Sequence, residues 1–336
     1  DAIRSTEYGK LVAAHNRTRA KLEAFCGKYG LEDAGYTDFH EFLSHPGLDI
    51  VVICTPSGTH LDVGQAAAEA GKHVIVEKPI EVSLERGRRL INNCRTHGVE
   101  LAVIYQNRFI EEVIEMKKAI DDGKAGKPFM VDVSVKLIRD QDYYDRAAWR
   151  GSLSLDGGGA VINQAIHTVD LMLWFMGDIE SLFAYKGTFT HEGIEGEDNA
   201  VAALQFKNGA IGVFRASTSI VPPGQRKIDI HGPKGTAVLN GDEFRLLSSE
   251  KDPSGVDDSV QSAGASSPLA GMTANHHKKQ YDQILYAFRH GEDPVVSGEE
   301  SLKSLAVVKA IYESSEKREL VILDEFLSGA ETGQEP

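Results

Sequence analysis

The N-terminal third of the chain alternates short apolar runs with longer amphipathic segments. Residues 49–54 and 73–76 are rich in β-branched residues, which is typical of strands buried on both faces of a sheet. Helices are expected between the apolar runs, and Gly30 and Gly71 stand where two of them end. Strands separated by helices predict βαβ units and a parallel sheet. The predicted strands cover residues 11–15, 49–54, 73–76 and 100–105, and the predicted helices cover residues 18–29, 37–43, 59–70 and 83–97.

The pattern changes after Tyr105. An amphipathic helix over residues 109–122 is followed by long runs of strand-forming residues. Asn208-Gly209 separates two of these runs and is a strong signal for a β-hairpin. This part of the chain therefore predicts an α/β domain with an open, mostly antiparallel sheet. Its strands are expected over residues 129–138, 181–189, 199–206, 210–219 and 227–230, and its further helices over residues 159–176, 276–289 and 299–316.

The length of 336 residues fits two domains of about 150 residues each. We expect a domain with a parallel sheet over residues 1–108 and an α/β domain with the open sheet over residues 109–326. Residues 248–275 are rich in Ser, Gly, Asp and Pro and predict a mobile loop, with a lid or a subunit contact as the alternative. Residues 327–336 predict a frayed tail.

Composition narrows the classes of partner. A net charge of −14 and a pI near 5.3 argue against binding to nucleic acid or to an anionic membrane. No stretch approaches the roughly 18 apolar residues that a membrane span needs. The three cysteines, Cys26, Cys54 and Cys94, fit neither a zinc site nor a disulfide framework, and Cys54 is expected in the core. We expect no metal site and a reducing, cytoplasmic compartment.

Glu77-Lys78-Pro79 directly follows the apolar run over residues 73–76. Pro79 cannot donate a ladder hydrogen bond, so the strand is expected to end there. Ligands of open α/β sheets bind beyond the carboxyl ends of the strands, which is where Lys78 is placed. A lysine there can carry a proton or anchor a hydroxyl group, because its pKa falls readily on burial. The alternative is an ordinary lysine in solvent.

Asn16-Arg17-Thr18 follows the first predicted strand. Dinucleotide-binding folds usually carry an acidic residue here, which bonds the adenosine ribose. An acid would repel a 2′-phosphate, whereas these three side chains would hydrogen-bond it. The segment therefore favours NADP over NAD, with an unliganded loop as the alternative.

Thr55-Pro56-Ser57-Gly58-Thr59-His60 breaks the chain sharply after the next strand. Thr59 is expected to cap the following helix. Exposed amides at such a turn suit an anionic or ribose ligand. Taken alone, this motif is a weak signal.

Asp156-Gly157-Gly158-Gly159 leads into a predicted helix that carries Asn163, His167 and Asp170. Their spacing of four and three residues places the three side chains on one helix face. Histidine titrates near neutral pH, so His167 can take and return a hydroxyl proton. Four residues on the segment before this helix are expected either to line a pocket or to pack in an ordinary core or interface: Tyr143, Tyr144, Trp149 and Arg150.

Together these motifs make the chain resemble the Gfo/Idh/MocA oxidoreductases. The resemblance covers nearly the whole chain and is carried, in order, by Cys54-Thr55-Pro56 with His60, Glu77-Lys78-Pro79, Gln106-Asn107-Arg108, Trp149-Arg150, and Gly158-Gly159 with Asn163, His167 and Asp170.

The resemblance implies a Rossmann-type dinucleotide-binding domain over residues 1–108, N-terminally incomplete, and a substrate-binding and oligomerisation domain over residues 109–326. It implies NAD(P)-dependent oxidation or reduction of a carbohydrate, cyclitol or sugar derivative. It also implies that Lys78 and His167 form the catalytic pair, and that one face of the open sheet joins copies of the chain as a homodimer or homotetramer. We expect substrate contacts from Asn163, Asp170, Tyr143, Tyr144 and Arg150. We expect cofactor contacts from Asn16, Arg17, Thr18, Thr55, Pro56, His60, Glu77, Lys78, Gln106 and Trp149.

Two departures from the family pattern stand out. The position that often carries Asp is Asn163 here, and an amide cannot ionise, so the proton transfer is left to His167 and Lys78. The chain also shows no glycine-rich phosphate loop. We expect the natural protein to be longer, with roughly 25 further residues forming the first strand and that loop.

Two other activities stay open at this point. Some proteins that resemble this family are non-catalytic sensors that bind a dinucleotide. Others are glycosidases that keep the nicotinamide bound and recycle its hydride. Retention of Lys78 and His167 argues against the sensor.

Overall fold

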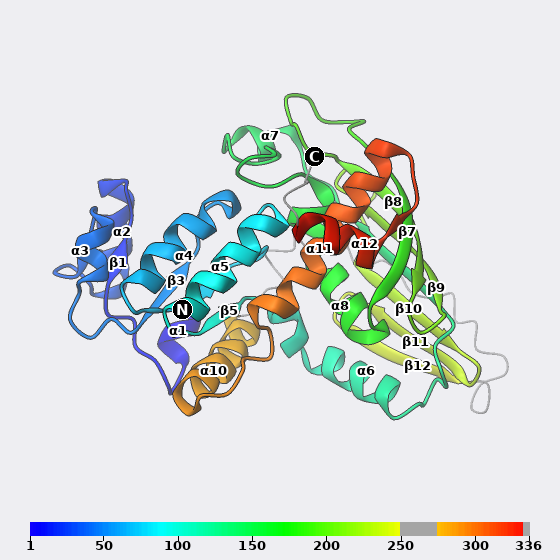
Figure 1. Ribbon diagram of the computed structural model, residues 1–336, viewed down its shortest axis with the longest axis horizontal. Helices are drawn as coiled ribbons and strands as arrows, with labels where there is room; N and C mark the ends of the chain where they lie inside the picture. Colours follow the sequence, from blue (N-terminus) through cyan, green and yellow to red (C-terminus); the bar gives the residue numbers. More distant parts are fainter. Residues whose placement is uncertain (249–273, 332–336) are drawn as a thin grey trace.

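The computed structural model describes residues 1–248 and 274–331. Figure 1 shows the parallel strands and their helices at one end of the molecule and a large sheet at the other. The predicted loop over residues 248–275 lies outside the described residues except at its two ends. Among the described helices, none is both long enough and apolar enough to cross a membrane.

The first domain contains parallel strands, as predicted, but they form two separate sheets. β1 (Ala14–His15) pairs with β2 (Gly35–Tyr36), and β4 (His73–Val76) lies between β3 (Ile50–Ile53) and β5 (Leu101–Val103). β1 is shorter than the predicted strand over residues 11–15. The helices of this domain are α1 (Ala2–Ser5), α2 (Arg19–Tyr29), α3 (Phe39–Leu43), α4 (His60–Glu69) and α5 (Leu84–Thr96), with short 3₁₀ turns η1 (Ser57–Thr59) and η2 (Gln106–Phe109).

The second domain is built on an eight-stranded sheet in the order β12-β11-β10-β6-β9-β8-β7-β13. Only β6 and β9 pair in parallel, so the prediction of a mostly antiparallel sheet is confirmed. Asn208-Gly209 forms the predicted hairpin between β8 and β9. The strands are β6 (Met130–Lys136), β7 (Ile179–Gly187), β8 (Asn199–Phe206), β9 (Ile211–Ser217), β10 (Lys227–Gly232), β11 (Gly235–Asn240), β12 (Glu243–Ser248) and β13 (Val321–Ile322).

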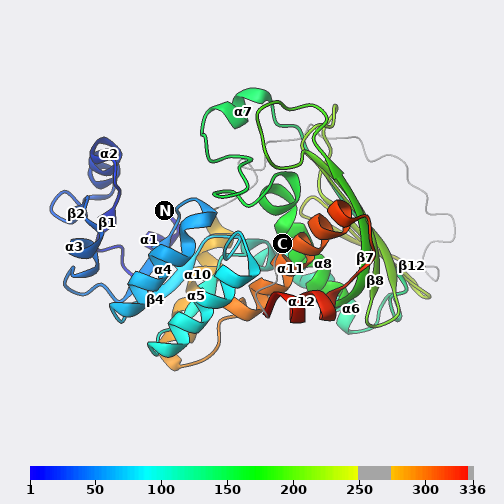
Figure 2. The ribbon, with the colours of Figure 1, turned by 45° about the horizontal axis from the view of Figure 1, so that its top comes forward.

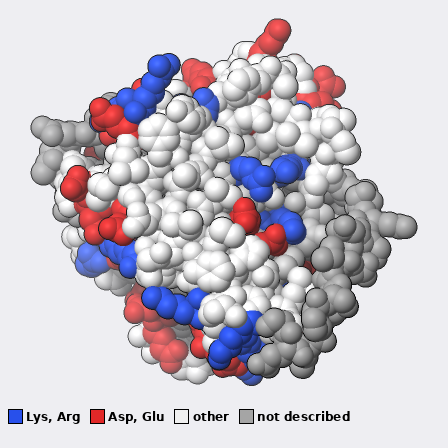
Figure 3. All heavy atoms as spheres, turned by 90° about the vertical axis from the view of Figure 1, so that its right-hand side faces the viewer, with Lys and Arg blue, Asp and Glu red and all other residues white. Residues whose placement is uncertain are grey.

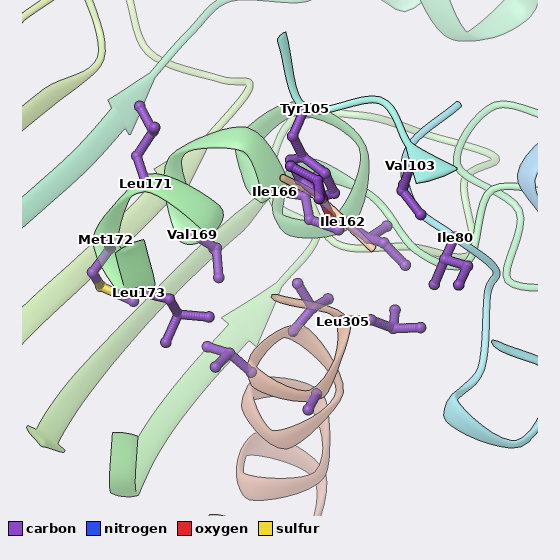
Figure 4. Close-up of a cluster of buried hydrophobic side chains, with 14 of the residues drawn as sticks. Ile80, Val103, Tyr105, Ile162, Ile166, Val169, Leu171, Met172, Leu173 and Leu305 are labelled. Atoms are coloured by element: carbon purple, nitrogen blue, oxygen red, sulfur yellow. The ribbon is translucent and has the colours of Figure 1, made fainter. Parts of the chain in front are cut away.

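Helices cover one face of this sheet, and Figure 2 shows them stacked on its inner side. They are α6 (Glu111–Asp121), α8 (Ile166–Met176), α11 (Gly298–Lys317) and α12 (Leu323–Glu331), while α7 (Gln141–Asp145) lies in a loop region above. α8 is apolar on almost every side and buried along nearly its whole length, as expected of a helix enclosed by other elements. In Figure 4, Ile166 at the start of α8 lies beside Tyr105 of the first domain, and α8 also packs against α11, which carries Leu305. The helix that carries His167 is therefore held by both domains.

The C-terminal part of the chain returns to the first domain. α10 (Ala274–His290) packs beside η2, and Gln280 Nε2 donates to the Val103 carbonyl at 2.9 Å. The Val103 amide donates to Val296 O at 3.1 Å, which closes the free edge of β5. Residues 274–297 thus belong in space with the first domain. At the end of the chain, α12 continues to Glu331, so residues 327–331 of the predicted tail are helical.

The prediction for Cys54 was wrong. Its side chain is exposed, whereas Cys26 and Cys94 are buried. β3 ends at Ile53, so Cys54 already belongs to the turn at the carboxyl end of the sheet. An apolar run in the sequence does not show which of its residues is the last one to be buried in the sheet.

Candidate active site

Lys78 lies at the carboxyl end of β4, and it reaches into the second domain. The Glu77 amide donates to Ile53 O at 3.0 Å, which extends the ladder by one residue before the cis Lys78–Pro79 peptide ends it. Lys78 Nζ donates to the main-chain carbonyl of Asn163 at 2.7 Å. Burial lowers the pKa of Lys78, and the charges of Glu77 and Asp156 oppose that shift. The ammonium group therefore has two remaining protons for a bound ligand.

His167 lies in the first turn of α8, and its side chain is buried. The edge of its ring meets the Tyr105 ring, with centroids 5.5 Å apart. Neither Nδ1 nor Nε2 has a hydrogen-bond partner among the described residues. Burial lowers the pKa of His167 well below its ordinary value, and the charges of Lys78, Arg226 and His277 lower it further. Lys78 and His167 are thus close enough for their charges to interact, and the imidazole is a neutral base at pH 7.

A buried carboxylate shapes the turn before His167. Glu197 accepts hydrogen bonds from the amides of Gly159 and Val161 and from the Tyr312 hydroxyl. The Glu197 carbonyl lies so close to Gly159 that a Cβ there would be 1.9 Å from its oxygen. Gly158 has a φ of +149°, which non-glycine residues rarely adopt. The glycine run is therefore required for this close approach.

The single helix predicted over residues 159–176 was wrong in its first part. The segment η3 (Ala160–Ala165) is a π-helix, and the α-helix begins at Ile166. A wider turn changes which side chains share a face. Asn163 therefore lies beside Lys78 with its main chain, while its side chain is directed to Asp156.

A polar network surrounds Asn163. Its Nδ2 donates to Asp156 Oδ1, and its Oδ1 accepts from Gln164 Nε2 at 2.8 Å. Gln164 Nε2 also donates to the Tyr143 hydroxyl at 3.0 Å, and Gln164 Oε1 accepts from Arg139 at 2.8 Å. The predicted residues Asn163 and Tyr143 are thus connected, through a glutamine that the motifs did not single out.

Two arginines flank the Tyr143 ring. The guanidinium carbon of Arg150 is 4.2 Å from the ring centroid, and that of Arg139 is 5.1 Å from it. Arg150 also lies 5.6 Å from the Trp149 ring. Neither arginine forms an ion pair with a carboxylate in the described part of the chain, and the Nε of each is buried without a partner. Two unpaired guanidinium groups beside a tyrosine can hold an anionic group.

The structure turns two of the predicted substrate residues to other partners. The Asp170 carboxylate receives two hydrogen bonds from Arg108, at 2.6 and 2.8 Å, in a buried ion pair that also includes Glu300. Tyr144 is buried, its hydroxyl is 3.0 Å from Thr218 Oγ1, and its ring packs against His191. Both side chains are thus engaged by other protein groups, and substrate contact from either one stays a prediction.

The turn after β3 is held by hydrogen bonds to both domains. His60 Nδ1 lies 3.0 Å from Pro79 O and its Nε2 3.0 Å from Thr55 O, so the buried imidazole ties the turn to the segment after Lys78. The Gly58 amide donates to Leu155 O at 2.9 Å. The prediction that Thr59 caps α4 was wrong, because its hydroxyl donates back to Pro56 O at 2.7 Å and lies 2.8 Å from Thr55 Oγ1, and it makes no cap hydrogen bond.

The remaining predicted cofactor residues occupy two places. Glu77 is partly buried and Gln106 fully buried at the carboxyl ends of β4 and β5, and burial raises the pKa of Glu77. Asn16, Arg17 and Thr18 are exposed beyond β1, where Asn16 Oδ1 accepts from the Thr18 amide at 2.9 Å. A cavity of about 620 Å³ is lined by residues such as Arg4, Lys10 and Asp33, and none of the predicted site residues lines it.

Several functional candidates were missed by the motifs. Asp156 and Gln164 contact Asn163, Glu197 holds the glycine turn, and the charges of Arg226 and His277 act on His167. Only Asp156 had a sequence signal, because it directly precedes the glycine run. The others come from strands and helices distant in sequence, which no local pattern connects.

Both domains match the models of one protein family. Residues 2–105 match the oxidoreductase family, NAD-binding Rossmann fold, and residues 117–323 match the oxidoreductase family, C-terminal alpha/beta domain, both of the Gfo/Idh/MocA type.

Individual relatives cover most of the chain. A myo-inositol 2-dehydrogenase of Thermotoga maritima is 28% identical over 317 residues, which are 91% of this chain and 89% of that protein. A D-apiose dehydrogenase of Paraburkholderia graminis is 28% identical over 330 residues, 96% of this chain and 85% of the relative. The crystal structure of the WlbA dehydrogenase from Bordetella pertussis, in complex with NADH and UDP-GlcNAcA, is 33% identical with a TM-score of 0.81, covering 94% of this chain and 90% of that one.

Proposed function

The chain belongs to the Gfo/Idh/MocA oxidoreductase family, and we propose that it acts on a sugar carrying a negative charge, with Lys78 and His167 as the catalytic pair. It is an NAD(P)-dependent oxidoreductase of a carbohydrate, cyclitol or sugar derivative. The observation that supports the pair best is the buried imidazole of His167, which has no hydrogen-bond partner among the described residues and interacts with the charge of Lys78. A buried polar group without a partner is costly unless a ligand satisfies it.

The two side chains divide the work on a substrate hydroxyl. His167 is neutral because its pKa is lowered by burial, so one ring nitrogen can accept the hydroxyl proton. Lys78 Nζ, held by Asn163 O, uses its remaining protons to hold the substrate oxygen and to stabilise negative charge that develops on it. A nicotinamide bound at this edge supplies the hydride chemistry.

The residues present suit a nicotinamide cofactor at the carboxyl edge of β3, β4 and β5. We expect Thr55, Pro56, Glu77, Gln106 and Trp149 to contact it, because the first four follow the carboxyl ends of β3, β4 and β5 and Trp149 lies on the segment after α7. His60 contributes by tying Thr55 to Pro79, since both of its ring nitrogens are engaged.

NADP is the cofactor that the segment after β1 favours. Asn16, Arg17 and Thr18 are exposed and uncharged or basic, which suits a 2′-phosphate. The Bordetella pertussis relative was crystallised with NADH, and the variant Asn16→Asp distinguishes the two cofactors because its charge would repel a 2′-phosphate.

The negative charge of the substrate is inferred from Arg139 and Arg150. Both flank Tyr143, which is connected through Gln164 to Asn163, and neither is paired with a carboxylate in the described ranges. The same arrangement suits a carboxylate or a phosphate. The relative crystallised with UDP-GlcNAcA supports a nucleotide-linked sugar.

Copies of the chain associate, in this proposal, through the outer face of the large sheet. Tyr185, Val201, Ile211 and Val213 are exposed on neighbouring strands there, with Tyr185 directly opposite Val201. Figure 3 views the molecule from the side of this sheet and shows a broad area without charged groups, next to a small cluster of basic and acidic side chains near the centre of the view. Apolar patches of this kind mark interaction sites.

The cellular compartment is inferred from the cysteines. The free cysteines support a reducing compartment such as the cytoplasm.

The test of this function is an initial-rate assay with NADP and NAD on three kinds of substrate. A neutral cyclitol, a free sugar acid and a UDP-linked sugar acid are compared, and formation of reduced nicotinamide is followed. Turnover should be fastest with one of the acidic substrates and should fall when Arg150 is replaced by Met. Equal turnover of the neutral cyclitol, or none of any substrate, would contradict the proposal.

A further inference from the structure

Asn163 connects Lys78 to a buried carboxylate. Its main-chain carbonyl accepts the hydrogen bond from Lys78 Nζ, and its side-chain amide donates to Asp156 Oδ1. The other oxygen of Asp156 accepts from the Gly151 amide at 2.9 Å, and the carboxyl group is buried. The Leu155 carbonyl, one residue earlier, accepts from Gly58 of the first domain. The position of Asp156 is thus fixed from both domains.

The arrangement places the negative charge of Asp156 near the Lys78 ammonium group. Position 163 carries an amide, which cannot ionise, so no charge comes from the side chain nearest to the Lys78 hydrogen bond. Asp156 and Lys78 are close enough for their charges to interact. The other titratable group acting on Lys78 is Glu77, and Lys78 in turn acts on His167. Arg150 acts on Asp156, and Arg226 and His277 act on His167.

We propose that Asp156 is a positioning residue that acts through Lys78. Its carboxylate, bonded to the residue that accepts from the lysine, keeps the ammonium group protonated and fixed against the Asn163 carbonyl. Asp156 thereby supplies, from a loop that precedes the helix, the negative charge that an acidic side chain at position 163 would supply. This inference rests on the catalytic role proposed for Lys78.

A double replacement tests the charge separately from the hydrogen bonds. In Asp156→Asn with Asn163→Asp, the new amide at 156 can donate to the new carboxylate at 163 and still accept from the Gly151 amide. The hydrogen bonds are kept and the charge moves by one side chain. Asp156→Asn alone removes the charge. Asp145→Asn, on the exposed end of α7, is the matched control.

The measurement is the pH dependence of Lys78 acetylation by acetic anhydride, quantified by peptide mass spectrometry. It needs no turnover, so it can fail or succeed independently of the dehydrogenase assay. Only the neutral amine reacts, so the midpoint reports the pKa of Lys78. Asp156→Asn should lower the midpoint by about one pH unit, about a tenfold increase in neutral amine. The double variant and Asp145→Asn should keep the wild-type midpoint.

An unchanged midpoint in folded Asp156→Asn would overturn the proposal, as would a double variant that fails to restore it. Thermal unfolding of each variant shows whether it folds. If Asp156→Asn does not fold, Asp156→Ser takes its place, because its hydroxyl can still accept a hydrogen bond and carries no charge. The midpoint must then fall, and a midpoint at or above that of the wild type counts against Asp156.

Discussion

Lys78 Nζ and the main-chain oxygen of Asn163 are 2.7 Å apart, although 85 residues separate them in the chain. This hydrogen bond joins the carboxyl end of β4 to the π-helical turn that leads into α8. His167 lies four residues after Asn163, in the first turn of α8. One bond therefore fixes the amine of the first domain relative to the imidazole of the second, before any ligand binds.

The pKa of His167 predicts how activity and stability depend on pH. Its folded-state pKa lies below the ordinary value of 6.5, so the buried ring is neutral and able to accept a proton at pH 7. On the acid side of the pH profile, we expect kcat/KM to fall only when the pH drops below that ordinary value. The unfolded chain takes up the proton near 6.5, so stability from the neutral ring is complete above 6.5 and lost as the pH falls toward the folded-state pKa.

Urea unfolding at about pH 7.5 and about pH 5.5 measures this loss. Burial also lowers the pKa of His60 and His277, which contribute with the same sign. His167→Gln should therefore lose less stability between the two pH values than the wild type does. An equal loss in both proteins would mean that the ring of His167 is not held neutral.

The buried ion pair of Arg108 and Asp170 should be important for stability. Asp170→Asn removes the buried carboxylate that receives two hydrogen bonds from Arg108 and leaves the guanidinium with Glu300 as its remaining charged partner, although the Arg108 side chain is almost fully buried. We expect the free energy of unfolding to fall by about 3 kcal/mol. Glu23→Gln breaks the exposed pair with Arg19 and should cost less than about 0.5 kcal/mol. Equal losses of unfolding free energy in the two variants would contradict this prediction.

Cofactor choice is tested at Asn16. Asn16→Asp places a negative charge where we expect the 2′-phosphate, so the ratio of kcat/KM for NADP to that for NAD should fall by at least about tenfold. Asn92→Asp, on the exposed face of α5, adds the same charge elsewhere and should leave the ratio unchanged. A wild-type protein that already prefers NAD would show that these residues do not select NADP.

Association through the outer sheet face is tested with Val213→Asp. Val213 is 40% exposed on β9, and a charge there would be buried if a second copy covered the face. Sedimentation velocity should show a multimeric wild type and a monomeric variant. Phe25→Asp, on the exposed surface of α2, is the control and should not change the state. A multimer that persists in Val213→Asp would place the interface elsewhere.

The sequence predicted correctly those helices and strands that are determined by residues within or next to them. The strand over residues 73–76 was correct to the residue, because an apolar β-branched run bounded by a lysine and a proline has few alternatives. The helix beginning after Ser83 was also predicted, and the Ser83 side chain accepts from the Arg86 amide as a cap should. These signals lie within a few residues of the element that they define.

The rest depends on contacts distant in sequence. The π-helical turn is held by Glu197, which follows it by more than thirty residues. The partner of Asp170 is Arg108, 62 residues earlier, and helical spacing alone gives no sign of this buried ion pair. The hairpin of β11 and β12 was not predicted, because its mixed sequence shows little alternation. Such features need the tertiary structure.

The central claim is that Lys78 and His167 act together on one hydroxyl group. The most direct test compares kcat of Lys78→Met, His167→Ala and the double variant on an accepted acidic sugar, with NADP affinity measured by fluorescence titration. Each single variant should lose at least about a hundredfold in kcat while binding NADP nearly as the wild type does, and the double variant should be little worse than the poorer single one. Wild-type kcat in either single variant would contradict the claim.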